Sequence, residues 1–101
     1  MSWYDTKRWH RKREHILKLD GYKDQIARRF GRTEEAVVVH HIYPRKEFPQ
    51  YAWSDWNLIS VSRSTHNQLE DFEGNLTEEG RALMQRTEPG KDWRKNRVRF
   101  V

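Results

Sequence analysis

Apolar side chains recur at helical spacing in the first third of the chain. Trp9 and Ile16 fall on one side of the segment 4–19, which predicts a helix with basic residues on its outer face. The same spacing between residues 22 and 30 predicts a second, shorter helix. We therefore expect residues 1–35 to form a helical and basic N-terminal part.

Two short runs of β-branched and apolar residues in the middle of the chain are typical of strands. The first, Ala36–Val39, leads directly into His40 and His41. The second is Leu58–Val61. Residues 44–57 separate the two runs, and because they contain prolines and aromatic residues without a clear period, they predict a long loop.

One helix is expected directly after the second strand, and another follows later in the chain. Either Ser62 or Ser64 can cap the first of these helices, which would continue past His66 to Phe72. The other is predicted over residues 77–86, with acidic residues in its first turn and an arginine in its last. The order of elements is therefore two helices, a strand, a loop, a strand and two helices.

Composition limits the chemistry that this chain can perform. Its 101 residues contain no cysteine, which excludes disulfides, thiolate zinc sites and thiol nucleophiles and leaves His, Asp, Glu and Asn as metal ligands. Hydrophobic and charged residues each make up 35% of the chain, so one small domain with a thin core is expected. No apolar run approaches the roughly 20 residues of a membrane span. We expect a cytoplasmic protein with no membrane partner.

Positive charge is concentrated at the two ends of the chain. Residues 1–18 and 91–101 each carry a net charge of +4, although the whole chain carries only +5. Because Lys and Arg make most phosphate contacts, this split indicates that the ends hold a nucleic acid and that the acidic middle carries the chemistry. The tail 91–101 would lie along DNA or add an edge strand. The basic residues that we expect to contact DNA are Arg8, Arg11, Lys12, Arg45, Arg63, Arg94 and Lys95.

Three histidines and one glutamate are candidates for that chemistry. Adjacent residues of a strand face opposite sides, so His40 and His41 should have different roles. One would bind a divalent cation together with His66, while the other, with an ordinary pKa of about 6.5, would take a proton from water. Glu70 lies four residues after His66, which places both on one helix face and makes Glu70 a further ligand. A polar strand end without any metal is the alternative that this spacing leaves open.

The same residues match a known motif. Residues 39–44 (VHHIYP), 56–60 (WNLIS) and 62–67 (SRSTHN) together resemble the His-Asn-His (HNH) motif of the ββα-metal endonucleases. The LKLDGY segment at residues 17–22 resembles the usual approach to this motif, and LTEEG at residues 76–80 resembles a segment that follows it in small phage-encoded members. About half of the chain is covered by the resemblance.

The resemblance implies an α+β fold with a ββα-metal hairpin-helix core and flanking helices. Residues 36–73 would hold the motif. They would lie between the helical basic part at residues 1–35 and a C-terminal helix with a basic tail at residues 74–101. All three parts would form a single nuclease domain, 1–101.

The resemblance also implies roles for individual residues. His41 would be the general base, and Asn57 would brace the loop that orients it. His40 and His66 would bind one divalent ion, with Glu70 as a third ligand where many members have another histidine. The ion would be Mg²⁺, Mn²⁺, Ni²⁺ or Zn²⁺, and it would stabilise the pentacovalent phosphate and the leaving oxygen.

Metal-dependent hydrolysis of DNA phosphodiesters is the activity implied by the resemblance. Nicking and double-strand cleavage both remain open, as do a monomer and a homodimer. Because small phage enzymes of this kind are encoded beside packaging terminases, a role in DNA packaging and a terminase partner in the host cytoplasm are expectations of the same resemblance.

Many relatives carry two cysteine pairs that bind a structural zinc, and this chain lacks both. The corresponding positions read KDQI at residues 23–26 and SRST at residues 62–65, so no structural zinc is expected. Packing would replace it, with the helix 22–30 lying under Trp53 and Trp56.

Two other functions fit parts of the sequence. Residues 26–37 resemble a helix-turn-helix, which would make the protein a DNA-binding regulator. Its recognition helix would, however, run through the β-branched residues 37–39. The second alternative is a catalytically inactive HNH module that only binds DNA or a packaging partner.

Overall fold

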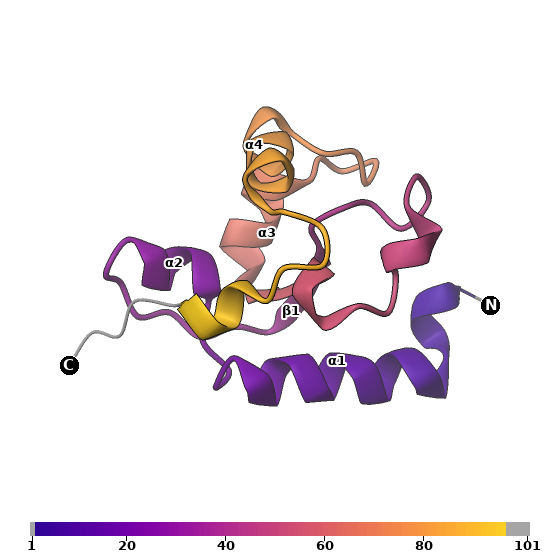
Figure 1. Ribbon diagram of the computed structural model, residues 1–101, viewed down its shortest axis with the longest axis horizontal. Helices are drawn as coiled ribbons and strands as arrows, with labels where there is room; N and C mark the ends of the chain where they lie inside the picture. Colours follow the sequence, from indigo (N-terminus) through magenta and orange to yellow (C-terminus); the bar gives the residue numbers. More distant parts are fainter. Residues whose placement is uncertain (1, 97–101) are drawn as a thin grey trace.

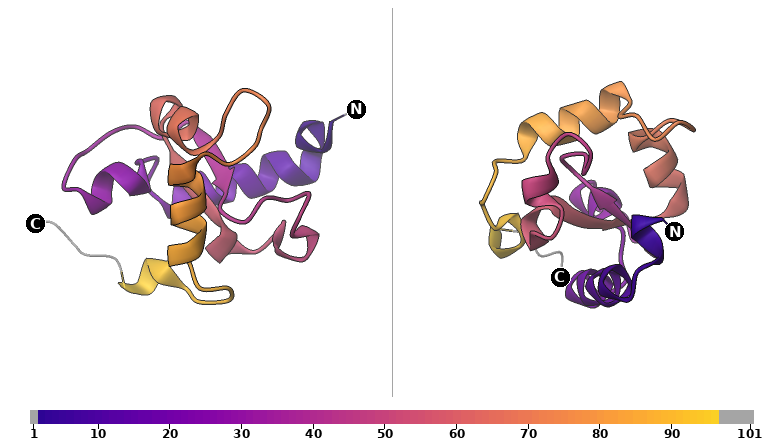
Figure 2. Two further views of the ribbon diagram at one scale, coloured as in Figure 1. Left: turned by 90° about the horizontal axis from the view of Figure 1, so that it is seen from above. Right: turned by 90° about the vertical axis from the view of Figure 1, so that its right-hand side faces the viewer.

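The computed structural model describes residues 2–96 of the chain. Its helices are α1 (Lys7–Leu19), α2 (Gln25–Arg29), α3 (Arg63–Leu69) and α4 (Glu78–Arg86), its strands are β1 (Val38–His41) and β2 (Leu58–Val61), and its 3-10 turns are η1 (Trp3–Asp5), η2 (Pro49–Tyr51), η3 (Asp55–Asn57) and η4 (Trp93–Asn96). The two strands form a central hairpin, with α1 along one side and α3 and α4 on the other (Figure 1 and Figure 2). None of the helices within residues 2–96 is long and apolar enough to cross a membrane.

The hairpin divides the core into two clusters. β1 and β2 are antiparallel, with Val38 opposite Val61 and His41 opposite Leu58. Because alternate residues of a strand face opposite sides, each strand contributes to both clusters. The cluster on the α1 side contains Trp9, Ile16, Leu17, Ala36, Val39 and Leu58. The cluster on the side of α3 and α4 contains Ile42, Ile59, Val61, Leu69 and Leu83.

The predicted order of helices and strands is confirmed, but boundaries differ in the first half of the chain. β1 begins at Val38, two residues later than predicted, and includes both histidines. α2 begins at Gln25 instead of Tyr22, because the backbone of Tyr22 is left-handed (φ 57°) and cannot be part of an α-helix. Asp24 caps α2 and accepts hydrogen bonds from two of its backbone N–H groups.

α3 is shorter than the sequence predicted. Ser62 caps it and accepts a hydrogen bond from the backbone N–H of Thr65, but the helix ends at Leu69. Glu70 has an extended backbone (φ −132°, ψ 144°) and therefore lies just beyond the helix. Phe72, to which this helix was predicted to extend, lies beyond it and is 96% exposed.

The helix-turn-helix interpretation is wrong. Within residues 26–37 only the remainder of α2 is helical, and the segment that would form a recognition helix leads into β1 as an extended chain. In the tail, residues 93–96 form the 3-10 turn η4, and the alternating residues 98–101 that predicted an edge strand are not among the described residues. Residues 97–101 lie outside the described part of the chain.

The carboxylate of Asp24 joins the two segments at which relatives carry cysteine pairs. One of its oxygens accepts hydrogen bonds from the N–H groups of Ile26 and Ala27 at 2.9 and 2.8 Å. Its other oxygen accepts the N–H of Ser62 at 2.8 Å. Burial alone would raise the pKa of Asp24, but hydrogen bonds from Ser62, Thr65 and Ala27 outweigh burial and lower it. A buried charged side chain therefore links α2 to the start of α3.

The two tryptophans that were predicted to cover α2 pack elsewhere. The ring of Trp53 lies 4.7 Å from that of Trp3, on the α1 side of the molecule. The ring of Trp56 lies 4.8 Å from that of Tyr51, within the long loop. The prediction that packing of these two rings replaces the zinc is therefore corrected: the Asp24 hydrogen bonds connect the two segments.

Side chains satisfy the edge of β2 that does not pair with β1. The N–H of Ser60 donates to Asp20 at 3.1 Å, and Arg94 donates to the carbonyl of Leu58 at 2.5 Å. Arg94 also forms an ion pair with the buried Asp20, at 2.7 Å. Together with the bond from Ser62 to Asp24, these contacts pair the backbone groups on the free edge of β2, as a third strand would otherwise do.

Asp24→Ala should lower the free energy of unfolding by roughly 2–4 kcal/mol, because it removes a helix cap and leaves the N–H of Ser62 without an acceptor. The pKa of Asp24 is lower in the folded than in the unfolded protein. Its contribution to the free energy of unfolding is therefore complete above the unfolded pKa of about 4 and is lost as the pH falls through the folded-state pKa. Thermal unfolding between pH 7 and pH 2 should therefore show the difference from wild type shrinking in acid. The exposed Glu79→Ala is the control, and a difference that does not depend on pH would contradict this role.

Candidate functional site

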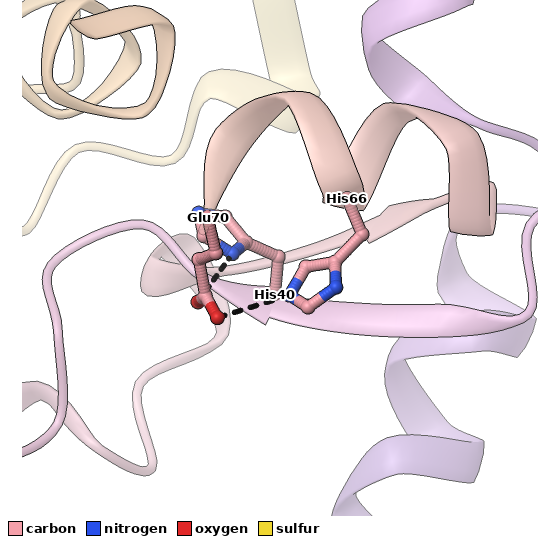
Figure 3. A group of neighbouring side chains, drawn as sticks. All are labelled: His40, His66 and Glu70. Carbon is pink, nitrogen blue, oxygen red and sulfur yellow. Dashed lines mark ion pairs between the residues drawn. The ribbon is translucent and has the colours of Figure 1, made fainter. Parts of the chain in front are cut away.

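Three of the predicted ligands meet between β1 and the end of α3. Nδ1 of His40 lies 3.1 Å from one carboxylate oxygen of Glu70, and Nε2 of His66 lies 3.3 Å from the other (Figure 3). One ligand atom from each residue lies within 4.8 Å of the others. Glu70 takes part although it lies beyond the helix, because its extended backbone directs the carboxylate back toward His66. The group could hold a divalent metal ion.

The surroundings of these residues suit a cation. The side chain of His40 is fully buried; its Nδ1 is paired with the carboxylate of Glu70, whereas its Nε2 has no hydrogen-bond partner within residues 2–96. Leaving such a group unsatisfied is costly, and a bound cation would remove that cost. Burial lowers the pKa of His40, which favours the neutral ring that coordinates metals. Burial alone would raise the pKa of Glu70, but its contacts with His40 and His66 lower it to about 2, so the carboxylate is charged.

His41 faces the opposite side of β1, as the alternation of strand residues predicts. Its ring stacks on the ring of Trp9, with centroids 5.3 Å apart and planes 22° apart. Its Nε2 atom lies 3.1 Å from the backbone carbonyl of Ala52, in the long loop. Burial lowers the pKa of His41 to about 4, so the imidazole is neutral at neutral pH.

Aromatic rings from the N-terminal segment enclose His41. Trp3 and Tyr4 turn their rings edge-on to it, at centroid distances of 5.5 and 6.0 Å. The guanidinium of Arg45 lies 4.7 Å from the ring centre of Trp3 and 5.3 Å from that of Tyr4. Sequence reasoning did not connect these residues with His41, because no spacing pattern relates the N-terminal turn to the end of a later strand.

Asn57 holds the long loop that contains Ala52. Its side-chain oxygen accepts the N–H of Tyr43 at 2.7 Å, and its amide group donates to the carbonyls of Tyr43 and Tyr51, each at 3.1 Å. Asn57 is fully buried, so these bonds are shielded from water. They fix the two ends of the loop that carries the carbonyl bonded to His41.

A cleft of about 350 Å³ opens beside both groups. His40, His41, His66 and Glu70 all contribute to its lining. Tyr4, Trp9, Arg13 and Arg63 lie on its walls, together with residues 37–39. The three candidate ligands and His41 therefore face one common space, although the side chains of His40 and His41 point to opposite sides of β1. Arg13 was not among the residues that we expected to contact DNA.

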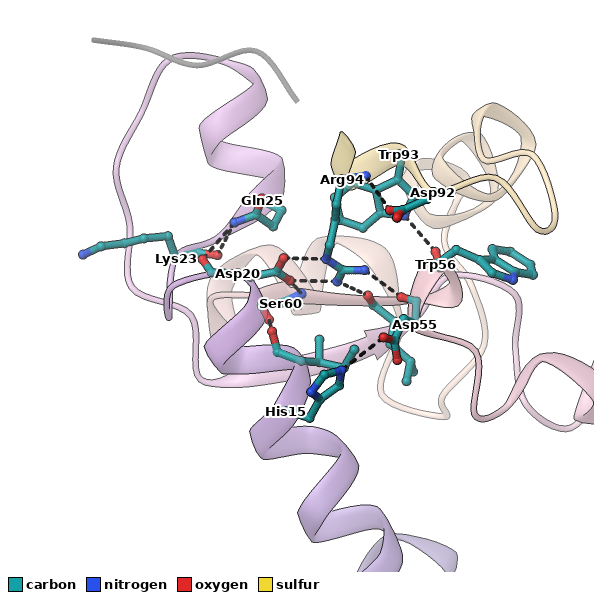
Figure 4. Close-up of polar contacts among 12 residues, drawn as sticks. His15, Asp20, Lys23, Gln25, Asp55, Trp56, Ser60, Asp92, Trp93 and Arg94 are labelled. Atoms are coloured by element: carbon teal, nitrogen blue, oxygen red, sulfur yellow. Dashed lines mark hydrogen bonds and ion pairs between the residues drawn. The ribbon is translucent and has the colours of Figure 1, made fainter. Parts of the chain in front are cut away.

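The basic residues expected on DNA differ in their environments. The exposed ones are Arg8, Arg11, Arg63 and Lys95. Lys12 forms an ion pair with Asp55, and Arg45 covers the aromatic rings beside His41. The side chain of Arg94 is only 7% exposed and is bonded to Asp20 (Figure 4). Arg94 is thus part of the fold, and we no longer place it on DNA.

A hairpin followed by a helix, with histidines from both around a cation-sized space, is the arrangement of a ββα-metal fold. A scan against protein-family models and a search of curated proteins give no match. Among solved structures, the chain is similar to the HNH endonuclease of the deep-sea thermophilic bacteriophage GVE2, crystallised with a manganese ion. The two are 29% identical, with a TM-score of 0.62 over 64% of this chain and 71% of the phage chain. The protein has an HNH-family fold.

Mn²⁺ should stabilise the folded protein through His40, His66 and Glu70. At a free Mn²⁺ concentration 100-fold above Kd, the stabilisation expected is about 2.7 kcal/mol, which is measurable as a rise in Tm. His66→Ala and Glu70→Gln should weaken Mn²⁺ binding in calorimetry. The loss should exceed the roughly 10–100-fold loss of metal affinity that is typical when a residue hydrogen-bonded to a ligand is changed. His10→Ala, which changes an exposed histidine on α1, should bind like wild type. Equal binding by all four proteins would show that the metal site lies elsewhere.

Proposed function

We propose that the protein is a divalent-metal-dependent DNA endonuclease of the HNH type. The observation that carries this proposal is the cleft in which a His-His-Glu group and a neutral histidine, His41, face the same space. The similarity to a phage HNH endonuclease crystallised with manganese supports it. Phosphodiester hydrolysis needs an activated water and a means of stabilising negative charge, and the two groups are suited to these separate tasks.

His41 is the proposed general base. A backbone carbonyl can only accept a hydrogen bond, so the bond to Ala52 places the ring proton on Nε2. Nδ1 is then unprotonated and can take a proton from water. Stacking on Trp9 fixes the plane of the ring, and Asn57 fixes the loop that supplies the carbonyl. Both are positioning residues, because they act on the substrate only through His41.

His40, His66 and Glu70 are the proposed metal ligands. When bound there, a divalent cation supplies Lewis-acid stabilisation of the negative charge that develops on the phosphate. The donors are two imidazoles and one carboxylate, a set that suits Mn²⁺, Ni²⁺ and Zn²⁺ and also admits Mg²⁺. Arg63 and Arg13, on the walls of the same cleft, would hold the phosphates of the DNA strand.

A single cleft of this kind cuts one DNA strand at a time. Double-strand cleavage would therefore require a dimer or two successive encounters. Because the similar structure comes from a bacteriophage, we extend the proposal to a phage enzyme that acts in the host cytoplasm beside a packaging terminase. The inactive-module alternative is weaker, because His41 is positioned by two independent contacts, one from Trp9 and one from Ala52.

Supercoiled plasmid should be nicked by the wild-type protein with Mn²⁺ or Mg²⁺ and left intact in EDTA. His41→Ala should lower the cleavage rate by roughly 10²–10⁴-fold, because a general base contributes about that much. It should still bind Mn²⁺ as tightly as wild type, because His41 lies on the other side of β1 from the ligands.

His66→Ala should lose both cleavage and metal binding, which separates the two roles. His10→Ala serves again as the control for preparation and folding. If wild type binds plasmid but does not cut it with any of Mg²⁺, Mn²⁺, Ni²⁺ or Zn²⁺, the chain is a DNA-binding module and the enzymatic proposal is wrong.

A further inference from the structure

A second cationic pocket lies apart from the catalytic cleft. It has a volume of about 420 Å³ and is lined by Arg29, Arg86, Thr87, Glu88, Lys91 and Trp93. The lining comes from the end of α2, the end of α4 and the segment that leads into η4. It shares no residue with the lining of the catalytic cleft.

The side chains around this pocket carry more positive than negative charge. Arg29 and Arg86 have no ion pair with any of residues 2–96, and neither forms a side-chain hydrogen bond within that part of the chain. Glu88 is the acidic residue in the lining, and it pairs at 3.9 Å with Lys91. Asp20, which lies nearby, is already bonded to Arg94. Arg29 and Arg86 are therefore free to bind an external anion.

Arginine side chains lie close to one another beside the ring of Trp93. The guanidinium of Arg29 lies 5.1 Å from the ring centre of Trp93, and that of Arg94 lies 4.2 Å from the same ring (Figure 4 shows the ring beside Arg94). Partial burial lowers the pKa of Arg29, repulsion from Arg86 and Arg94 lowers it further, and Asp20 opposes this change. Like charges are thus held close together, and an anion bound between them would relieve the repulsion.

We propose that this pocket binds a phosphate group of the DNA backbone, at a point remote from the bond that is cut. Arg29 and Arg86 would make charge-assisted hydrogen bonds to the phosphate oxygens. The inference rests on the proposed function, because it takes DNA as the source of the phosphate. It implies that longer substrates are held at two separate places, with only the catalytic cleft taking part in the chemistry.

DNA binding in EDTA tests the pocket separately from cleavage. Fluorescence anisotropy with a labelled 30-base-pair duplex, at several salt concentrations, should show weaker binding by Arg29→Ala and Arg86→Ala. Because each lost phosphate contact removes roughly 0.9 from the slope of log K against log salt, the double variant should lower that slope by about 1 to 2. Arg81→Ala, an exposed change on the same helix α4, should leave affinity and slope unchanged.

Two further measurements exclude a purely structural role for Arg29. Arg29→Lys keeps the positive charge and should restore most of the affinity, whereas a role confined to stacking on Trp93 would not be rescued. On plasmid, Arg29→Ala and Arg86→Ala should raise KM with little change in kcat, because neither residue lies in the catalytic cleft.

Each result has a definite meaning. Unchanged affinity and salt slope in folded Arg29→Ala and Arg86→Ala would overturn the proposal. Inorganic phosphate that raises the Tm of wild type but not of the double variant, without any effect of these variants on DNA affinity, would show a free-phosphate site and would also overturn it. A wild-type protein that binds the duplex but never cleaves would contradict the endonuclease function, and the anisotropy series would still decide whether the pocket binds DNA.

Discussion

A sheet of two strands leaves one edge of β2 without a backbone partner, and the structure depends on how that edge is satisfied. Asp20 accepts the N–H of Ser60, Asp24 accepts that of Ser62, and Arg94 donates to the carbonyl of Leu58. These side chains come from the end of α1, the start of α2 and η4, so one edge fixes three distant segments (Figure 4 shows Asp20, Ser60 and Arg94). Without these bonds, buried N–H and C=O groups would remain unpaired. The cost would be a large part of the free energy of unfolding of a small domain.

The alternation of β1 explains how so small a protein separates two kinds of chemistry. His40 and His41 are adjacent, yet one meets His66 and Glu70 while the other stacks on Trp9. A metal ion that contacted both imidazoles would compete with the proton that a base must accept. In the proposed endonuclease, their positions on opposite sides of β1 would keep the metal ligand apart from the general base while both line one cleft.

The sequence predicted the order of elements, because hydrophobic period carries that information directly. Spacing grouped Glu70 with His66, but the choice of His40 over His41 came from the resemblance to the HNH motif, and the structure brings these three side chains together. The sequence could not predict that Phe72 would be exposed or that Glu70 would lie beyond α3, because helix ends depend on tertiary contacts as much as on local propensity. Arg94 is the clearest failure: it was expected on DNA and lies instead against Asp20. Composition and spacing reveal how many cations a segment carries, but not which of them has a buried carboxylate within reach.

The acidic residues of the middle of the chain therefore have an effect on its basic surface. Asp20, Asp24 and Glu70 are turned inward and satisfied by Arg94, by backbone N–H groups and by the two ligand histidines. Asp20 thereby removes Arg94 from the basic surface, whereas Arg29 and Arg86 have no ion-pair partner among residues 2–96. Because the net charge of +5 is modest, the position of each cation matters more than the total for attracting a polyanion. In the proposed endonuclease, arginines without a carboxylate partner inside the protein are the ones that remain available to a DNA backbone.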